Sequence, residues 1–137
     1  MTVRAVDTSV VVPALLASHT EHERCRVAAA GCSVPAHVLV EAYSVLTRLP
    51  SPHRLRPEVA DTLLARWFPA DKVLVVPAAL QRAVPARLRA SGVSAGAVFD
   101  GLVALTAAAH DRQLLTRDIR ALRTYEAIGV SYRVLEP

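Results

Sequence analysis

The segment Val3-Arg4-Ala5-Val6-Asp7-Thr8-Ser9-Val10 sets an acidic residue between a strand pattern and a helix pattern. Residues 3–7 predict the first β-strand, and Thr8 or Ser9 can cap a helix that runs to about Ser18. In open α/β sheets, ligands bind beyond the carboxyl ends of the strands. Asp7 is therefore predicted to lie at the edge of the sheet where such folds bind ligands.

The same alternation of short β-branched runs and longer helical patterns continues along the chain. Further strands are predicted over 33–35, 72–76, 113–116 and 130–135. Further helices are predicted over 20–30, 36–48, 57–67, 78–91, 95–111 and 119–127. Pro85 is expected to break or kink the helix that contains it. The pattern predicts an α/β fold: a doubly wound sandwich with a central, mostly parallel sheet of about five strands flanked by helices.

The bulk composition indicates one globular unit with a sizeable core. Of the 137 residues, 53% are hydrophobic, so we expect a single domain over 1–137. The longest apolar runs, such as residues 10–17, are too short to cross a bilayer, and the chain begins directly with a strand pattern. We therefore expect a cytoplasmic protein without a membrane span. Cys25 and Cys32 lack a second pair to complete a zinc site and are expected to be small buried residues.

The charge balance favours a polyanionic partner. The net charge is +4, and Lys72 is the single lysine among sixteen basic residues. If four of the twelve acidic residues gather in one cleft, the remaining surface is more basic than the total indicates. Arginine excess can also reflect genomic base composition, and few aromatic residues are available to stack on bases. Charge alone therefore does not select nucleic acid.

Four acidic residues stand at the edges of apolar stretches that should be buried, and they predict a shared metal site: Asp7, Glu41, Asp100 and Asp118. Burying one uncompensated carboxylate costs several kcal/mol, so four in one small domain call for a cation. Asp7 and Asp118 directly follow predicted strands, and the helices over 36–48 and 95–111 can bring the other two to the same rim. Oxygen ligands without a Cys or His pattern favour Mg²⁺ or Mn²⁺ over zinc.

Each acid also has a purely structural interpretation. Asp7 and Asp118 can cap a helix or turn, Glu41 can pair with a nearby arginine, and Asp100 can be a favourable charge at a helix N-terminus. These alternatives stay open for each residue alone, but the joint occurrence of the four makes them less attractive. His19, His22 and His37 have no further ligands beside them that would complete a metal site.

In this order, the motifs resemble a PIN domain, with the VapC-type toxins as the subgroup similar in length. The resemblance rests on four segments and spans residues 3–135: Asp-Thr-Ser-Val from Asp7, Val-Glu-Ala around Glu41, Phe-Asp-Gly-Leu-Val-Ala-Leu-Thr-Ala-Ala around Asp100, and Leu-Leu-Thr-Arg-Asp ending at Asp118. It implies that these four acids are the catalytic, metal-binding residues. Thr116 corresponds to the hydroxyl residue two positions before the last Asp.

The resemblance implies a Mg²⁺-dependent endoribonuclease that cuts single-stranded or loop RNA and is the toxin of a type II toxin–antitoxin pair. Thr8, Ser9 or Thr116 could hydrogen-bond a carboxylate or a phosphate, and Arg117 could face phosphate or be a surface charge on a turn. A cognate VapB-type antitoxin and a homodimer are the expected partners. Apolar bulk at the helix over 57–67 is expected either to line a groove for the antitoxin or to fill the chain's own core: Val59, Leu63, Trp67 and Phe68.

Other functional classes fit the sequence less well. An aspartyl phosphatase would carry a second Asp at position 9, where Ser9 stands, and a phosphoacceptor domain would carry an Asp after the third strand, where Val76-Pro77 stands. The sequence has no phosphate-binding Gly-rich loop and no Gly-x-Ser-x-Gly motif. The remaining alternative is a non-catalytic, PIN-like module that binds RNA or protein, which leaves the four acids without a role.

Overall fold

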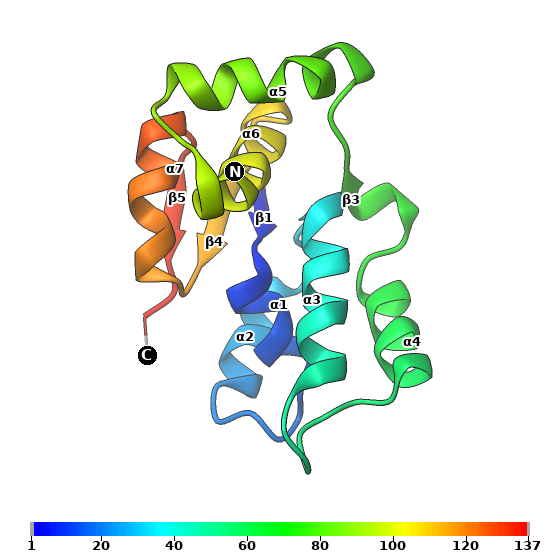
Figure 1. The fold of residues 1–137 in the computed structure, drawn as a ribbon. Helices are drawn as coiled ribbons and strands as arrows, with labels where there is room; N and C mark the ends of the chain where they lie inside the picture. The colour runs from blue at the N-terminus through cyan, green and yellow to red at the C-terminus, as the bar shows by residue number, and fades with distance from the viewer. Residues whose placement is uncertain (1, 137) are drawn as a thin grey trace.

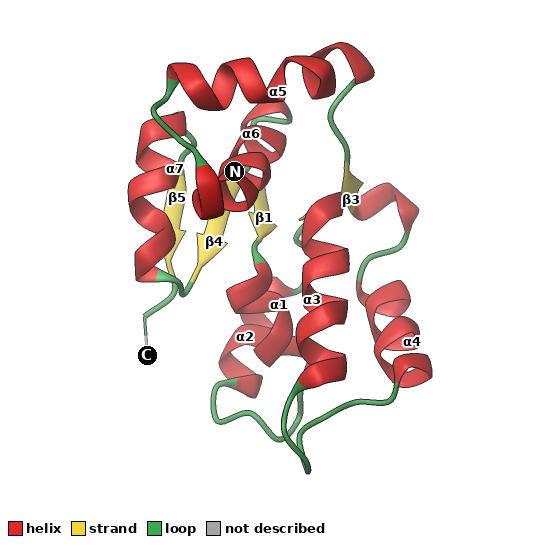
Figure 2. Ribbon diagram, in the orientation of Figure 1, coloured by secondary structure: helices red, strands yellow, loops and turns green. Residues whose placement is uncertain are grey.

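The computed structural model describes residues 2–136 (Figure 1). The strands in this range are β1 (Arg4–Val6), β2 (Val34–Pro35), β3 (Val73–Leu74), β4 (Gln113–Thr116) and β5 (Tyr132–Val134). β1, β4 and β5 form one parallel sheet with β4 in the middle (Figure 2), and β2 and β3 pair in parallel. A parallel bridge between Ala5 and Ser33 joins the two sets, which makes the strand order β3-β2-β1-β4-β5. The predicted α/β fold with a parallel arrangement of five strands is confirmed.

Helices connect the strands in sequence. Their bounds are α1 (Thr8–Leu15), α2 (His22–Ala29), α3 (Ala36–Arg48), α4 (Pro57–Trp67), α5 (Ala78–Ala90), α6 (Val98–Ala109) and α7 (Leu122–Ile128). Single 3₁₀ turns lie at η1 (Ala70–Lys72), η2 (Ala95–Ala97) and η3 (Ile119–Ala121). In Figure 1, α1 to α4 lie together in the lower part of the view, and α5 crosses above α6 and α7.

Several predicted boundaries differ from the structure, and the largest difference concerns Pro85. Helix α5 runs through this residue, although a proline removes one backbone hydrogen bond there. Val84 and Leu88 are buried on either side of it and hold both halves of the helix against α6. The first helix ends at Leu15 instead of Ser18, and the third strand is shorter than predicted. The segments predicted as helices over 95–111 and 119–127 each begin with a 3₁₀ turn.

The main hydrophobic core surrounds the central strands. Val6, Val34 and Leu114 are fully buried there, together with Cys25 from α2, and Cys32 is nearly so. Both cysteines are free, in agreement with their predicted role as small buried residues. A smaller cluster joins α5 to α6. None of the helices within residues 2–136 combines the length and the apolar character of a bilayer-spanning segment.

The strand order places a topological switch between β1 and β4. From β1 the chain proceeds outward to β2 and β3, and it then returns to β4 on the other side of β1. Val6 pairs with Leu115, so the two strands end at the same edge of the sheet. Ligands of open α/β sheets bind at such a point because the loops there diverge. Asp7 follows β1 and Asp118 follows β4 by one intervening residue, so both acids lie at the switch.

Candidate active site

Asp7 is the buried centre of the site, with 5% of its surface exposed. Its backbone is extended and it is the N-cap of α1, where Oδ1 accepts hydrogen bonds from the Ser9 backbone N–H at 3.0 Å and from the Ser9 hydroxyl at 2.6 Å. Burial raises the pKa of the Asp7 carboxyl, and the hydrogen bonds from Ser9 oppose that rise. The predicted capping role of Asp7 is therefore real and coexists with its position at the switch.

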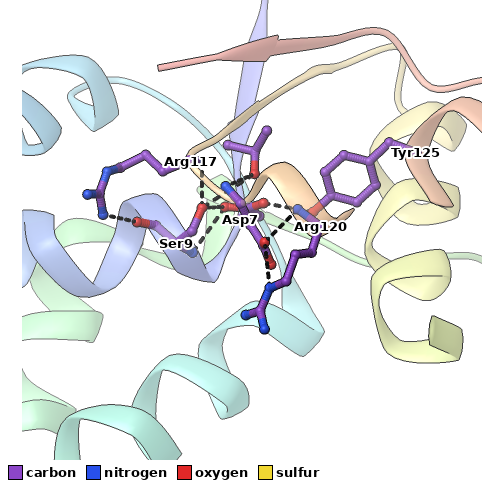
Figure 3. Close-up of polar contacts among 7 residues, drawn as sticks. Asp7, Ser9, Arg117, Arg120 and Tyr125 are labelled. Atoms are coloured by element: carbon purple, nitrogen blue, oxygen red, sulfur yellow. Dashed lines mark hydrogen bonds and ion pairs between the residues drawn. The ribbon is translucent and has the colours of Figure 1, made fainter. Parts of the chain in front are cut away.

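Tyr125 supplies the third hydrogen bond to this carboxylate. Its hydroxyl reaches from α7 and donates to Asp7 Oδ2 at 2.7 Å, and the tyrosine is 1% exposed (Figure 3). Burial and the negative charge of Asp7 raise the pKa of the Tyr125 phenol, so it remains a donor at neutral pH. Tyr125 was not among the site residues predicted from the sequence. A tyrosine on the inner face of a short helix after Asp118 was the available signal, because a buried phenol needs a partner.

The Ser9 hydroxyl joins the ends of β1 and β4. It accepts a hydrogen bond from the Arg117 backbone N–H at 2.7 Å and lies 3.4 Å from the Thr116 hydroxyl. The Arg117 side chain donates from Nη1 to the Ser9 carbonyl at 3.3 Å, as Figure 3 shows, so its guanidinium contacts the backbone of α1. Ser9 and Thr116 therefore act here as supports of the acidic site.

Asp118 ends the loop after β4 and caps the 3₁₀ turn η3. Its Oδ1 accepts from the Arg120 backbone N–H at 3.0 Å, and its own N–H donates to the Thr116 hydroxyl at 3.0 Å. The Arg120 Nε lies 3.6 Å from the same carboxylate oxygen, but the Arg120 side chain is 94% exposed. An ion pair so open to solvent contributes little to stability and leaves the carboxylate accessible.

Glu41 faces the site from α3. Its Oε1 accepts a hydrogen bond from the Thr8 hydroxyl at the start of α1, and its Oε2 lies 3.7 Å from His37 Nε2 one helical turn earlier. The expected alternative, pairing with an arginine, is wrong: among the described residues, its polar partners are Thr8 and His37. The hydrogen bond to Thr8 joins α3 to α1 beside Asp7.

Asp100 lies in the first turn of α6 and is half-buried. Burial raises the pKa of its carboxyl, and the negative charges of Asp118, Glu41 and Asp7 raise it further. All three other predicted acids therefore act electrostatically on Asp100. These effects on Asp100 indicate that the other three acids lie in the same region of the molecule.

The donor set fits a hard divalent cation, because it consists of carboxylate oxygens surrounded by hydroxyl groups. The side chains are not arranged as a finished cage, however. Within residues 2–136, no three Asp, Glu, His or Cys side chains are placed to hold one ion together. Asp7, Glu41 and Asp118 are instead held by separate hydrogen-bond partners, and a metal site shared by these three acids and Asp100 stays a prediction.

The histidines that lacked metal partners in the sequence have structural roles. His19 Nδ1 accepts from the Glu21 N–H at 3.0 Å, and the His22 Nδ1 is 2.9 Å from the Pro13 carbonyl. The His37 ring stacks on the Phe99 ring at the rim of the acidic site, with centroids 5.4 Å apart and an interplanar angle of 6°. Phe99 is a second residue that the sequence analysis did not identify.

An apolar groove of about 650 Å³ runs between α3 and α4. Its lining residues are Leu39, Val40, Tyr43, Pro57, Glu58, Asp61, Leu64, Ala65 and Phe68. Of the bulky residues expected at a groove or in the core, Phe68 is buried in the core and also lines the groove, Leu63 and Trp67 are half-buried against the core, and Val59 is half-buried. Val40 is 68% exposed and Tyr43 is 39% exposed, so α3 contributes the open wall.

Comparison with known proteins places this geometry in a family. The PIN domain family matches residues 4–127. The chain is 44% identical to Ribonuclease VapC27 of Mycobacterium tuberculosis over 128 residues, which is 92% of each protein. It is 40% identical to Ribonuclease VapC40 of the same species over 132 residues, covering 96% of this chain and 98% of the relative.

Solved structures share the fold at low sequence identity. The FitAcB structure from Neisseria gonorrhoeae aligns with a TM-score of 0.60 and 20% identity, over 93% of this chain and 94% of the other. The VapBC2 structure from Rickettsia felis, bound to a promoter DNA fragment, aligns with a TM-score of 0.64 and 15% identity, over 98% and 100% of the two chains. With the family match over most of its length and with VapC relatives at 40–44% identity, this chain belongs to the PIN-domain family and to its VapC group.

Proposed function

We propose that this protein is a Mg²⁺-dependent endoribonuclease that cuts single-stranded or loop RNA and is the toxin of a type II toxin–antitoxin pair. The observation that carries the proposal is the placement of Asp7 and Asp118 just after β1 and β4 at the topological switch, with Glu41 joined to the start of α1 by the Thr8 hydroxyl. Burial and the charges of these three acids raise the pKa of Asp100, and repulsion within an all-oxygen set favours binding of a cation. The ribonuclease names of the two relatives support RNA as the substrate.

Mg²⁺, or Mn²⁺ in its place, would be held by Asp7, Asp100 and Asp118, with Glu41 as a further ligand or as a group that orients the nucleophile. When bound, one or two such ions supply Lewis-acid stabilisation of phosphate charge and activation of water. The chain's own groups orient the acids. Ser9 and Tyr125 fix both oxygens of Asp7, and Thr8 holds Glu41.

The reaction consistent with this site is hydrolysis of a phosphodiester bond that leaves a 5′ phosphate and a 3′ hydroxyl. The net charge of +4 favours attraction of the RNA backbone. The Arg117 side chain donates a hydrogen bond to the Ser9 carbonyl, so in the proposed mechanism it supports the backbone beside Asp7.

A VapB-type antitoxin is the proposed partner, and the α3–α4 groove is the proposed surface for its apolar segment. Val40 and Tyr43 offer exposed apolar surface to it, and the VapC and VapBC2 names of similar proteins support such pairing. A homodimer is part of the same proposal. The alternative is a module that binds RNA or protein without cutting, and it predicts binding that does not depend on the acids.

The decisive experiment is cleavage of a random-sequence, single-stranded RNA pool by the antitoxin-free protein in Mg²⁺, in Mn²⁺ and in excess chelator. We expect cleavage only with metal. Asp7→Asn and Asp100→Asn should lose most activity while RNA binding persists, because arginine contacts to phosphate do not need the carboxylates. Asp61→Asn on exposed α4 is the matched control and should cut normally.

Undiminished cleavage in chelator would refute the metal-dependent mechanism. Binding of RNA without cleavage under all three conditions would favour the non-catalytic module. Mapping the ends of the products tests the chemistry separately, since a 3′ phosphate or a cyclic phosphate would contradict hydrolysis at the 3′ oxygen.

A further inference from the structure

The ring pair His37–Phe99 spans the two helices that carry Glu41 and Asp100. The rings are nearly parallel, with centroids 5.4 Å apart and an interplanar angle of 6°. His37 precedes Glu41 by one helical turn on α3, and Phe99 directly precedes Asp100 on α6. Each ring of the stack is therefore on the same helix as one of the acids, His37 with Glu41 and Phe99 with Asp100.

Phe99 remains open to solvent although His37 covers part of it. The residue is 54% exposed, and the His37 side chain is 28% exposed. A single exposed phenylalanine needs no explanation. A phenyl ring held parallel to a neighbouring ring and beside the proposed reaction centre is different, because it presents an aligned aromatic face to any planar ligand there.

A nucleobase is the planar group that the proposed substrate would bring to this place. Unpaired RNA bases are commonly recognised by stacking on aromatic side chains, and this contact tolerates different bases because each has a π-face. In the proposed function the scissile phosphate lies at the acids. The ring pair is one helical turn from Glu41 and one residue from Asp100, so a base flanking that phosphate is the planar group best placed to meet it. A protein partner would need apolar bulk at Phe99 but would gain little from the parallel arrangement.

We infer that Phe99, supported by His37, is the stacking subsite for a base of the RNA nucleotide that flanks the scissile phosphate. This inference rests on the proposed ribonuclease function and adds the residue that positions the substrate base. It makes Phe99 a substrate-binding residue, whereas the acids perform the chemistry.

The test combines a protein variant with a substrate variant. The cleavage site of the native protein is first mapped in a random-sequence, single-stranded RNA pool, and one cleaved 12-nucleotide RNA is then synthesised intact or lacking the base on either side of the cut. Phe99→Ala should raise KM about tenfold on the intact RNA, with a much smaller change in kcat. For the native protein, removing one of the flanking bases should raise KM by a similar factor. For Phe99→Ala, removing that base should raise KM little further.

Two further variants separate stacking from apolar contact. Phe99→Trp keeps an aromatic face and should retain native KM, whereas Phe99→Leu keeps apolar bulk without that face and should behave like Phe99→Ala. Val27→Ala removes another exposed apolar side chain, on α2, and should leave KM unchanged. Melting temperatures check that each variant is folded.

The outcomes distinguish this inference from the proposed function. If the native protein cuts no RNA, the ribonuclease assignment fails first and the subsite fails with it. The stacking inference alone is overturned if the native protein cuts RNA in Mg²⁺ and Phe99→Ala has the same KM. It is also overturned if the increase in KM from Phe99→Ala and the increase from removing the base combine without any overlap. It is also overturned if Phe99→Ala disrupts only a homodimer or antitoxin binding, since the ring would then be a protein contact.

Discussion

The hydroxyl of Tyr125 donates a 2.7 Å hydrogen bond to Oδ2 of Asp7, across 118 positions of sequence and inside the core. Asp7 Oδ1 is occupied by Ser9, so both oxygens of the most buried predicted acid are oriented by other residues. Hydrogen-bond partners of metal ligands fix their orientation and tune their affinity. The acidic site is therefore positioned by helix α7 as well as by the two strands that end there.

Tyr125→Phe should weaken metal binding without leaving a cavity in the core. The ring stays in place, but Asp7 loses a donor to a charged group, and such bonds contribute about 1.5–3 kcal/mol. We expect roughly tenfold weaker Mn²⁺ binding by calorimetry and a lower free energy of unfolding at neutral pH. Tyr132→Phe is the matched control, because its hydroxyl also donates to a carboxylate, Glu126 at 2.5 Å, but on the exposed side. Equal Mn²⁺ affinity in both variants would contradict the positioning role.

Asp100→Asn should raise the melting temperature in chelator at neutral pH. Burial, followed by the charges of Asp118, Glu41 and Asp7, raises the pKa of Asp100 in the folded state. A carboxyl with a raised folded pKa favours folding fully below its unfolded pKa of about 3.9, and this contribution is lost as pH rises through the folded value. The stabilising effect of Asn should therefore be present at pH 7 and shrink under acidic conditions.

The same pair of proteins tests the cation. Mg²⁺ should stabilise the native protein more than Asp100→Asn, by about 2.7 kcal/mol at a hundredfold excess over Kd if the variant no longer binds. Thermal unfolding with and without Mg²⁺ measures both effects. If Asp100→Asn melts lower in chelator and Mg²⁺ shifts both proteins equally, the four acids form a structural network with no metal-binding role.

Gly101→Ala should destabilise the protein through the α5–α6 contact. A Cβ at this position would lie 2.5 Å from Leu88 Cδ2 and 3.3 Å from Val93 Cγ1. Overpacking costs about 1–3 kcal/mol, which exceeds the gain of roughly 1 kcal/mol from replacing a helical glycine. Denaturant unfolding should therefore show a net loss. Gly96→Ala, where a Cβ meets nothing within 4 Å, is the control and should be close to neutral.

Val40→Glu should relieve inhibition by the antitoxin and leave RNA cleavage by the free toxin unchanged. The valine is 68% exposed on the groove wall, where a carboxylate would oppose docking of an apolar segment. We expect at least about tenfold weaker inhibition in a titration with the purified antitoxin. Val27→Glu on α2 is matched in exposure at 61% and should be inhibited normally. Equal inhibition of both variants would place the antitoxin elsewhere.

The sequence by itself determined the elements and the placement of two of the acids. Period-two and helical patterns located β4 and α3 with the bounds that the structure has. Because parallel strands end at a common edge, the pattern also placed Asp7 and Asp118 together at the switch. These features follow from local periodicity and chain connectivity, both of which can be read along one segment at a time.

Only the tertiary structure decided the partners of the acids. Three contacts join residues that are far apart in sequence: the hydrogen bond from Tyr125 to Asp7, the hydrogen bond from Thr8 to Glu41, and the ring stack of Phe99 on His37. No local pattern selects one such contact over another. The continuation of α5 through Pro85 has the same origin, because packing of Val84 and Leu88 outweighs the local preference of proline to end a helix. Side-chain partners depend on how separate elements pack, and packing is a property of the whole fold.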